Sequence, residues 1–183
     1  RGIRVVPEID LPGHVRALLA AHPEFSCTGD VPRHALEKYG ICPDVLCAGN
    51  DEAVAYCERV LDIQVSALVK RMEYAHLDHC VVGISGGVDS TLCVIVCAMA
   101  VRKMGLPSTN VVACTLPCFG TSSRTKSNAI VVAEQLGCEV RVIDIGKSVY
   151  QHFDDIGHAH DDYSVAFENA QARERTQGLV DIA

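Results

Sequence analysis

Three short apolar runs, separated by helix-like segments, constrain the fold of this chain most strongly. The runs cover residues 80–84, 110–116 and 139–145, and helices are predicted between them over residues 91–103 and 125–136. A strand that recurs after each helix is typical of a parallel sheet with helical crossovers. The sequence therefore predicts an α/β fold of three layers, in which helices cover both faces of a parallel sheet.

A glycine-rich loop joins the first of these strands to the helix that follows it. Two adjacent glycines let the backbone turn so that its N–H groups converge, and two serine hydroxyls add donors. The following helix directs the positive end of its dipole to the same point, which predicts a pyrophosphate site. A carboxylate here makes sense only if it holds Mg²⁺, so Asp89 is the predicted metal ligand. The loop comprises Gly83, Ile84, Ser85, Gly86, Gly87, Val88, Asp89 and Ser90.

Two other types of nucleotide-binding loop are excluded by the residues of this segment. A Walker A loop requires Gly-Lys-Ser/Thr, and residues 83–90 contain no lysine. A dinucleotide-binding fingerprint requires Gly-x-Gly-x-x-Gly, which the segment also lacks. The remaining alternative to a phosphate site is a Gly-Gly turn that only joins a strand to a helix.

The motif Ser-Gly-Gly-x-Asp-Ser at residues 85–90 is the signature of N-type ATP pyrophosphatases, and three further segments resemble the glutamine-dependent NAD synthetase family. The resemblance extends from about residue 63 to residue 183. It implies a three-layer parallel sheet of the adenine nucleotide alpha hydrolase-like type. The three segments are Thr115–Ser122, Asp155–His158 and Glu168–Thr176.

This resemblance implies a ligase that uses ATP and Mg²⁺. Residues 83–90 would bind the ATP phosphates, and Asn169 and Arg173 would contact deamido-NAD. The last two are four positions apart and so share one helix face, although a solvated, charged helix face is the simpler alternative. In the implied reaction the nicotinate carboxylate attacks the α-phosphorus of ATP, and ammonia then displaces AMP. No covalent enzyme nucleophile is needed, because positioning and charge stabilisation carry the catalysis.

The same resemblance implies partners and flanking segments. A glutaminase domain that supplies ammonia should precede the synthetase domain, and a segment with a further acidic metal ligand should follow it. Arg1 is followed at once by strand-like residues, and residues 176–183 look like a helix in progress, so the chain is expected to be truncated at both ends. A complete synthetase domain would form a homodimer.

Residues 1–62 resemble another family, the β-N-acetylhexosaminidases among the glycoside hydrolases. Residues 1–14 and 46–52 carry the match, and Asp10 and His14 correspond to residues that support the sugar site. That family folds as a (β/α)₈ barrel of roughly 250 residues, so this part supplies a barrel fragment only. The acid catalyst should lie in an Asp-Glu pair on the next strand, and the sequence changes to the synthetase pattern before it. Asp10 and His14 are therefore the remains of a vestigial sugar site, and in this chain they are expected to behave only as a strand end and part of a Pro-Gly turn.

Composition limits the partners further. The net charge is -7, with scattered Lys and Arg, which argues against a nucleic-acid surface. No apolar run approaches the ~18 residues that a membrane span needs. The ten cysteines lack the spacing of zinc ligands, and so many thiols without an apparent partner suggest a reducing cytoplasm.

The sequence thus predicts two domains, at residues 1–62 and 63–183, and leaves three functions open. They are a truncated NAD synthetase-type ligase, a β-N-acetylhexosaminidase, and a nucleotide-binding fragment without turnover. Four local predictions accompany this division. Asn50 is predicted to cap a helix that ends near Asp62, and residues 14–21 are predicted to form a helix. Residues 1–62 are predicted to form no stable core of their own. A last helix is predicted over residues 163–183.

Overall fold

The computed structural model describes residues 15–28, 45–119 and 130–183. Contacts divide the chain into two compact units, Arg1–Ile63 and Gln64–Ala183. The strand predicted over residues 3–9 lies outside the described residues, as do Asp10 and His14. In the described parts, the helices lack the apolar run that crossing a bilayer requires.

The larger unit is built on a parallel sheet of three described strands, as predicted. These are β1 (Cys80–Gly83), β2 (Val111–Thr115) and β3 (Glu139–Val142), and both pairings are parallel in the order β1-β2-β3. All five residues of β2 are buried, because this strand lies between the other two and carries helices on both of its faces. The apolar run at residues 110–116 is therefore the pattern of a central strand.

One face of the sheet is covered by α3 (Val88–Lys103), and its core includes Met72 of α2 (Asp51–Ala75). Val111 and Ala113 of β2 point into this layer, since alternate residues of a strand share one face. Residues 65–72 of α2 supply one helical face to the core, because Val65, Val69 and Met72 are buried and Leu68 is partly buried. The main buried residues here are Met72, Ile84, Val94, Ala98, Val101, Val111, Ala113, Ala133 and Cys138.

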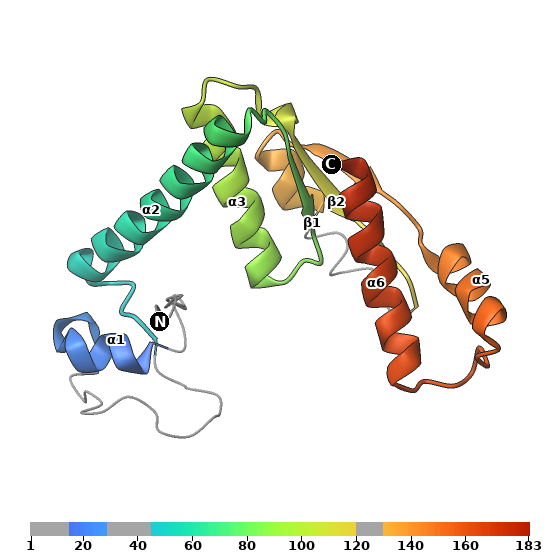
Figure 1. Ribbon diagram of the computed structural model, residues 1–183. Coiled ribbons are helices and arrows are strands. Elements are labelled where there is room, and N and C mark those ends of the chain that lie inside the picture. The colour runs from blue at the N-terminus through green and yellow to red at the C-terminus, as the bar shows by residue number, and fades with distance from the viewer. Residues whose placement is uncertain (1–14, 29–44, 120–129) are drawn as a thin grey trace, which may run out of the picture. The chain divides into compact units, whose positions relative to one another are not determined.

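The opposite face is covered by α5 (Gly146–Ile156) and α6 (Val165–Ile182). Val112 and Cys114 of β2 point into this second layer, together with Phe153. Figure 1 shows α3 and α6 on opposite sides of the strands. The predicted three-layer arrangement is confirmed, and α6 begins within two residues of its predicted start.

The connections agree with the turn residues of the sequence. The short 3₁₀ helix η2 (Ser108–Asn110) leads into β2. Residues 130–135 belong to the helix predicted over 125–136. Gly137 has a φ of 76°, and a left-handed glycine at this point ends the helix, as predicted.

The third strand is shorter than predicted, and the helix after it was not predicted. β3 ends at Val142 rather than Ile145, because the Asp144 carboxylate accepts a hydrogen bond from the Gly146 N–H at 2.8 Å and α5 begins there. Gly157, with a φ of 69°, ends α5. The spacing of Val149 and Phe153, four residues apart and both buried, is the signal that could have revealed this helix.

The helix that starts after Asn50 is longer than predicted. α2 covers Asp51–Ala75 without interruption, so the predicted end near Asp62 is wrong. No glycine or proline occurs between Asp51 and Ala75, and nothing in the local sequence therefore breaks the helix. The change from one family resemblance to the other falls inside a regular helix.

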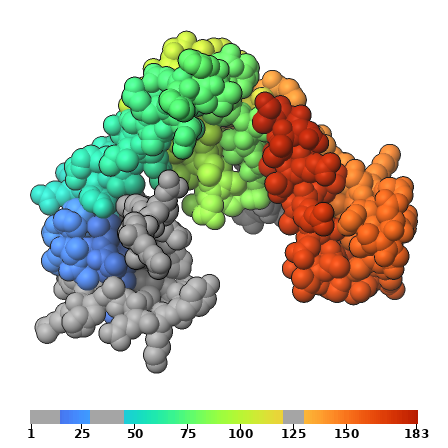
Figure 2. Space-filling view, in the orientation of Figure 1, coloured from blue at the N-terminus to red at the C-terminus, as the bar shows by residue number. Residues whose placement is uncertain are grey.

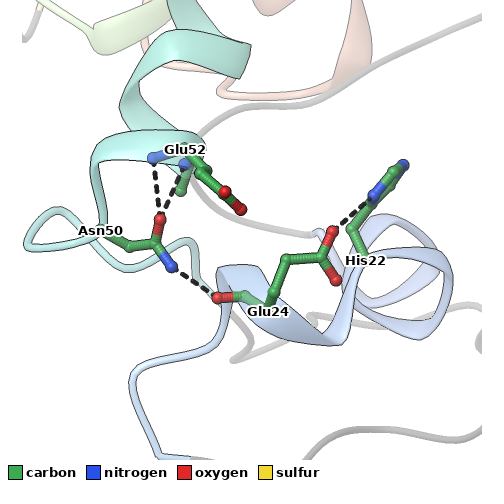
Figure 3. Close-up of polar contacts among 5 residues, drawn as sticks. His22, Glu24, Asn50 and Glu52 are labelled. Atoms are coloured by element: carbon green, nitrogen blue, oxygen red, sulfur yellow. Dashed lines mark hydrogen bonds and ion pairs between the residues drawn. The ribbon is translucent and has the colours of Figure 1, made fainter.

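The start of α2 is fixed by the predicted cap (Figure 3). The Asn50 side-chain oxygen accepts hydrogen bonds from the N–H groups of Glu52 at 2.9 Å and Ala53 at 3.1 Å. Its amide nitrogen donates to the Glu24 carbonyl oxygen at 2.6 Å. One side chain thus caps the helix and ties it to a segment 26 residues earlier.

The smaller unit contains a hydrophobic cluster of its own, while the prediction that residues 1–62 form no stable core stays a prediction. Its first described helices are α1 (Arg16–Ala21) and the 3₁₀ helix η1 (Pro23–Phe25). A disulfide joins Cys27 to Cys47, so these two thiols are paired, contrary to the cysteine interpretation from sequence. The cluster contains Val15, Leu19, Phe25, Leu46 and Ala53.

Candidate functional site

The glycine-rich loop lies between the end of β1 at Gly83 and the start of α3 at Val88. The helix starts three residues before the predicted Thr91, so the turn itself is shorter than expected. Gly86 has a φ of 84°, a conformation that residues other than glycine rarely adopt. Gly87 is the N-cap residue of α3, and no side chain forms a capping hydrogen bond there, so N–H groups of the first turn are left available. The geometry matches that of an anion site at a helix N-terminus.

The two serines of the loop brace its backbone. The Ser90 hydroxyl donates to the Gly87 carbonyl oxygen at 3.1 Å and accepts from the Ser85 N–H at 3.2 Å. The two serine hydroxyls are also 3.2 Å apart. Sequence reasoning made both hydroxyls donors to a phosphate, whereas the structure uses the Ser90 hydroxyl to hold the loop in its turn.

Asp89 lies in the first turn of α3 and is exposed. Among the described residues, no lysine, arginine or histidine forms an ion pair with it, and no group of three metal-binding side chains occurs. Mg²⁺ is usually held by one or two carboxylates together with substrate phosphates and water. A single accessible carboxylate beside a phosphate-binding turn fits that donor set, so Asp89 suits Mg²⁺ that arrives with a nucleotide.

A cavity of about 330 Å³ opens beside this loop. It lies at the carboxyl ends of β1 and β2, where ligands bind in open α/β sheets. The loops that follow the two strands meet here, since Ser85 and Pro117 both line the cavity. Its described lining is Gly83, Ile84, Ser85, Thr115, Leu116, Pro117, Arg175 and Leu179.

One side of the cavity is formed by α6. Arg175 and Leu179, one turn apart, both line it, and the Arg175 Nε donates to the Leu116 carbonyl oxygen at 3.3 Å. A Cβ atom at Gly83 would lie 2.8 Å from the Leu179 Cδ1, so the glycine lets α6 approach the end of β1 closely. Sequence reasoning did not select Arg175, although it lies in the segment at residues 168–176.

Asn169 and Arg173 are not brought into this cavity. Both are exposed, and they lie on the face of α6 opposite to the one that packs on the sheet. Figure 2 shows part of α6 in red at the surface of the molecule. Arg173 instead lines a small hollow between α5 and α6, beside His152 and Gln177.

Cys118 directly follows Pro117, a residue that lines the cavity. Burial raises the pKa of its thiol. A thiol with a raised pKa carries little thiolate at neutral pH and is a poor nucleophile.

Comparison with known proteins connects the larger unit to NAD synthetases. The sequence profile of the family described as NAD synthase matches residues 60–183. The glutamine-dependent NAD(+) synthetase of Mycobacterium tuberculosis is 40% identical over 131 residues, which cover 69% of this chain and 19% of that protein. The chain thus spans about a fifth of the length of the curated synthetases that it matches.

A solved structure shares the fold. The glutamine-dependent NAD+ synthetase from Acinetobacter baumannii, solved in complex with ADP, superimposes with a TM-score of 0.61 at 20% identity. The alignment covers 81% of this chain and 25% of that one. The chain therefore shares the α/β parallel-sheet fold of this synthetase.

The N-terminal part matches a second family. The profile described as glycosyl hydrolase family 20, catalytic domain, matches residues 1–79. The beta-hexosaminidase of Porphyromonas gingivalis is 41% identical over 64 residues, which cover 34% of this chain and 8% of that protein. Both resemblances noted in the sequence are thereby confirmed, and the two profiles overlap over residues 60–79, at the end of α2 and just beyond it.

The synthetase match covers two thirds of the chain and contains all three described strands, the loop at residues 83–90 and the helix that closes the cavity. Sequence, fold and site geometry agree on this part. The chain therefore belongs to the NAD synthase family.

Proposed function

We propose that residues 63–183 form the ATP-binding part of a NAD synthetase, which activates deamido-NAD with ATP and converts it to NAD with ammonia. The loop at residues 83–90 carries this proposal, because its turn meets the uncapped N-terminus of α3 beside the cavity. Family membership supports the ligase reaction over other uses of the same loop.

The proposed roles follow from the positions of the residues. The phosphates of ATP lie on the first N–H groups of α3, and the base and ribose lie in the cavity. Asp89 would hold Mg²⁺ beside the phosphates, where the ion would offset the negative charge of the leaving pyrophosphate. Asn169 and Arg173 contact deamido-NAD from the exposed face of α6, outside the cavity.

The nicotinate carboxylate attacks the α-phosphorus, the bond to pyrophosphate breaks, and an acyl-adenylate forms. Ammonia then attacks the acyl carbon, AMP leaves, and the nitrogen loses a proton. The chain contributes positioning and fixed dipoles at the phosphates rather than a covalent nucleophile. The ammonia source is a glutaminase domain, and the working unit is a homodimer of the synthetase domain.

We further propose that the domain boundary lies near residue 62, and that residues 1–62 are a fragment of a (β/α)₈ barrel. The two contact units meet at Ile63 and Gln64, which supports this boundary. Similarity to the glycoside hydrolase profile supports the barrel ancestry.

The test of the main proposal is a pyrophosphate-release assay on the full chain. We expect release only when Mg²⁺, ATP, deamido-NAD and ammonia are all present, with NAD formed in equal amount. Tight Mg·ATP binding without pyrophosphate release would instead favour a nucleotide-binding fragment without turnover. No Mg·ATP binding at millimolar concentration would contradict the proposal itself.

A β-N-acetylhexosaminidase activity is the second candidate, because residues 1–79 match that family. We expect no hydrolysis of an aryl β-N-acetylglucosaminide. The acid catalyst of that family should lie in an Asp-Glu pair beyond residue 62, where the synthetase pattern already begins. The measurement is nitrophenol release by the intact chain. A release that His14→Ala abolishes would show that this expectation is wrong.

A further inference from the structure

The Arg175 side chain has an unusual environment for a cation. It is half-buried and lines a cavity whose other side chains are mainly aliphatic, among them Ile84, Leu116 and Leu179. Its Nε bond to the Leu116 carbonyl oxygen is the hydrogen bond that the structure records. None of the described carboxylates forms an ion pair with it. A partly desolvated guanidinium without a counter-charge is costly unless a ligand contacts it.

The Nε bond also restricts the orientation of the guanidinium plane. A guanidinium is flat and more weakly hydrated than an ammonium, so its face stacks well on aromatic rings. Leu179, one helical turn further along α6, adds an aliphatic wall to the same cavity. The close approach at Gly83 keeps this wall in place, because Leu179 packs where a side chain at residue 83 would otherwise lie.

The size and lining of the cavity favour a heteroaromatic ring over a phosphate. A volume of about 330 Å³ is at the small end of ligand pockets, and the lining is mainly apolar. Of the loop at residues 83–90, only the first three residues, Gly83, Ile84 and Ser85, are among the described lining of the cavity. Residues 86–90, with the N-terminus of α3, offer the phosphates a separate site. The cavity is thus left for the base and ribose.

We propose that Arg175 is a base-contacting residue, whose guanidinium stacks on the purine ring of the nucleotide in this cavity. The inference rests on the proposed use of ATP, and it assigns Arg175 a role separate from both the phosphate loop and the proposed deamido-NAD contacts. Stacking of a partly desolvated arginine on an aromatic ring should strengthen binding by about 5- to 30-fold. That gain applies equally to every ligand that carries the base.

The test compares three ligands on the full chain by calorimetric titration: adenosine, Mg·ATP and Mg·pyrophosphate. For Arg175→Gln we expect adenosine and Mg·ATP to bind about 5- to 30-fold more weakly, with pyrophosphate unchanged. Arg175→Lys keeps the charge and loses the flat face, so it should resemble Arg175→Gln. The matched control is Arg71→Gln, at an exposed position of α2, which should change none of the three affinities.

Three results would overturn the proposal. Weaker binding of Mg·ATP and pyrophosphate with unchanged adenosine would assign Arg175 to the phosphates. If Arg175→Gln binds all three ligands more weakly by the same factor and also melts at a lower temperature, Arg175 only anchors α6 to Leu116. Unchanged affinities in Arg175→Gln would leave it no role in binding. If the wild-type chain binds adenosine but neither Mg·ATP nor pyrophosphate, the proposed function fails, and the adenosine affinity of Arg175→Gln still decides the stacking contact.

Discussion

Replacing Asp89 by alanine should weaken the binding of Mg·ATP at least tenfold. The carboxylate is exposed in the first turn of α3, beside the turn that we propose for the phosphates. Even outer residues of metal sites typically contribute about 10- to 100-fold to affinity or activity, and a direct ligand should contribute no less. Calorimetric titration with ATP, at fixed and at zero Mg²⁺, measures the effect. Asp89→Asn keeps the size of the side chain and should lose as much.

The control for this experiment is Asp161→Ala, which removes another exposed carboxylate from the same unit. It should leave the affinity for Mg·ATP unchanged. Loss of the Asp89 charge near a helix N-terminus should cost only about 0.3–1 kcal/mol of folding stability, so unfolding of the protein cannot explain the loss of binding. Equal affinities for Asp89→Ala and the control would rule out Asp89 as the metal ligand.

Replacing Phe153 by alanine should lower the free energy of unfolding of the larger unit by about 3–5 kcal/mol. Phe153 is completely buried between α5, α6 and the sheet. Its ring centroid lies 5.6 Å from that of Phe167 and 4.8 Å from that of His158. Truncation therefore removes apolar burial and leaves a cavity that the surrounding side chains can only partly fill. Urea unfolding measures the decrease in the free energy of unfolding. Hydrogen exchange of the β2 amides then shows that the decrease belongs to this unit.

Ile156→Ala is the matched control, because Ile156 lies three residues further along α5 and is 54% exposed. Its loss should stay within about 0.5 kcal/mol, as for most surface substitutions. If both variants lose the same stability, the layer formed by α5 and α6 is not part of the folded core.

The phosphate loop could be recognised from sequence because its properties are local. Two glycines, a strand before them and a helix after them are enough to place N–H groups at one point. The alternation of strands and helices likewise predicted the parallel sheet, since β2 is buried on both sides and shows this as an unbroken apolar run. The structure changed only the ends of these elements, by one to three residues.

Two predictions from the sequence were wrong: the end of the helix after Asn50, and the absence of paired cysteines. The helix after Asn50 was ended near Asp62 because the family resemblance changes there, although no residue up to Ala75 breaks a helix. The bond between Cys27 and Cys47 joins residues 20 apart, and sequence spacing alone could not single out this pair.

The sequence by itself determined the fold class, the family and the glycine-rich loop that we propose for the phosphates, because each depends on residues that are neighbours along the chain. Only the tertiary structure decided which arginine of α6 lines the cavity. Arg173 and Arg175 are two positions apart, so they point to different sides of the helix. Packing of Phe167 and Ala170 on the sheet turns Arg175 inward and Arg173 toward solvent. That choice depends on contacts between segments far apart in the chain, which no local pattern contains.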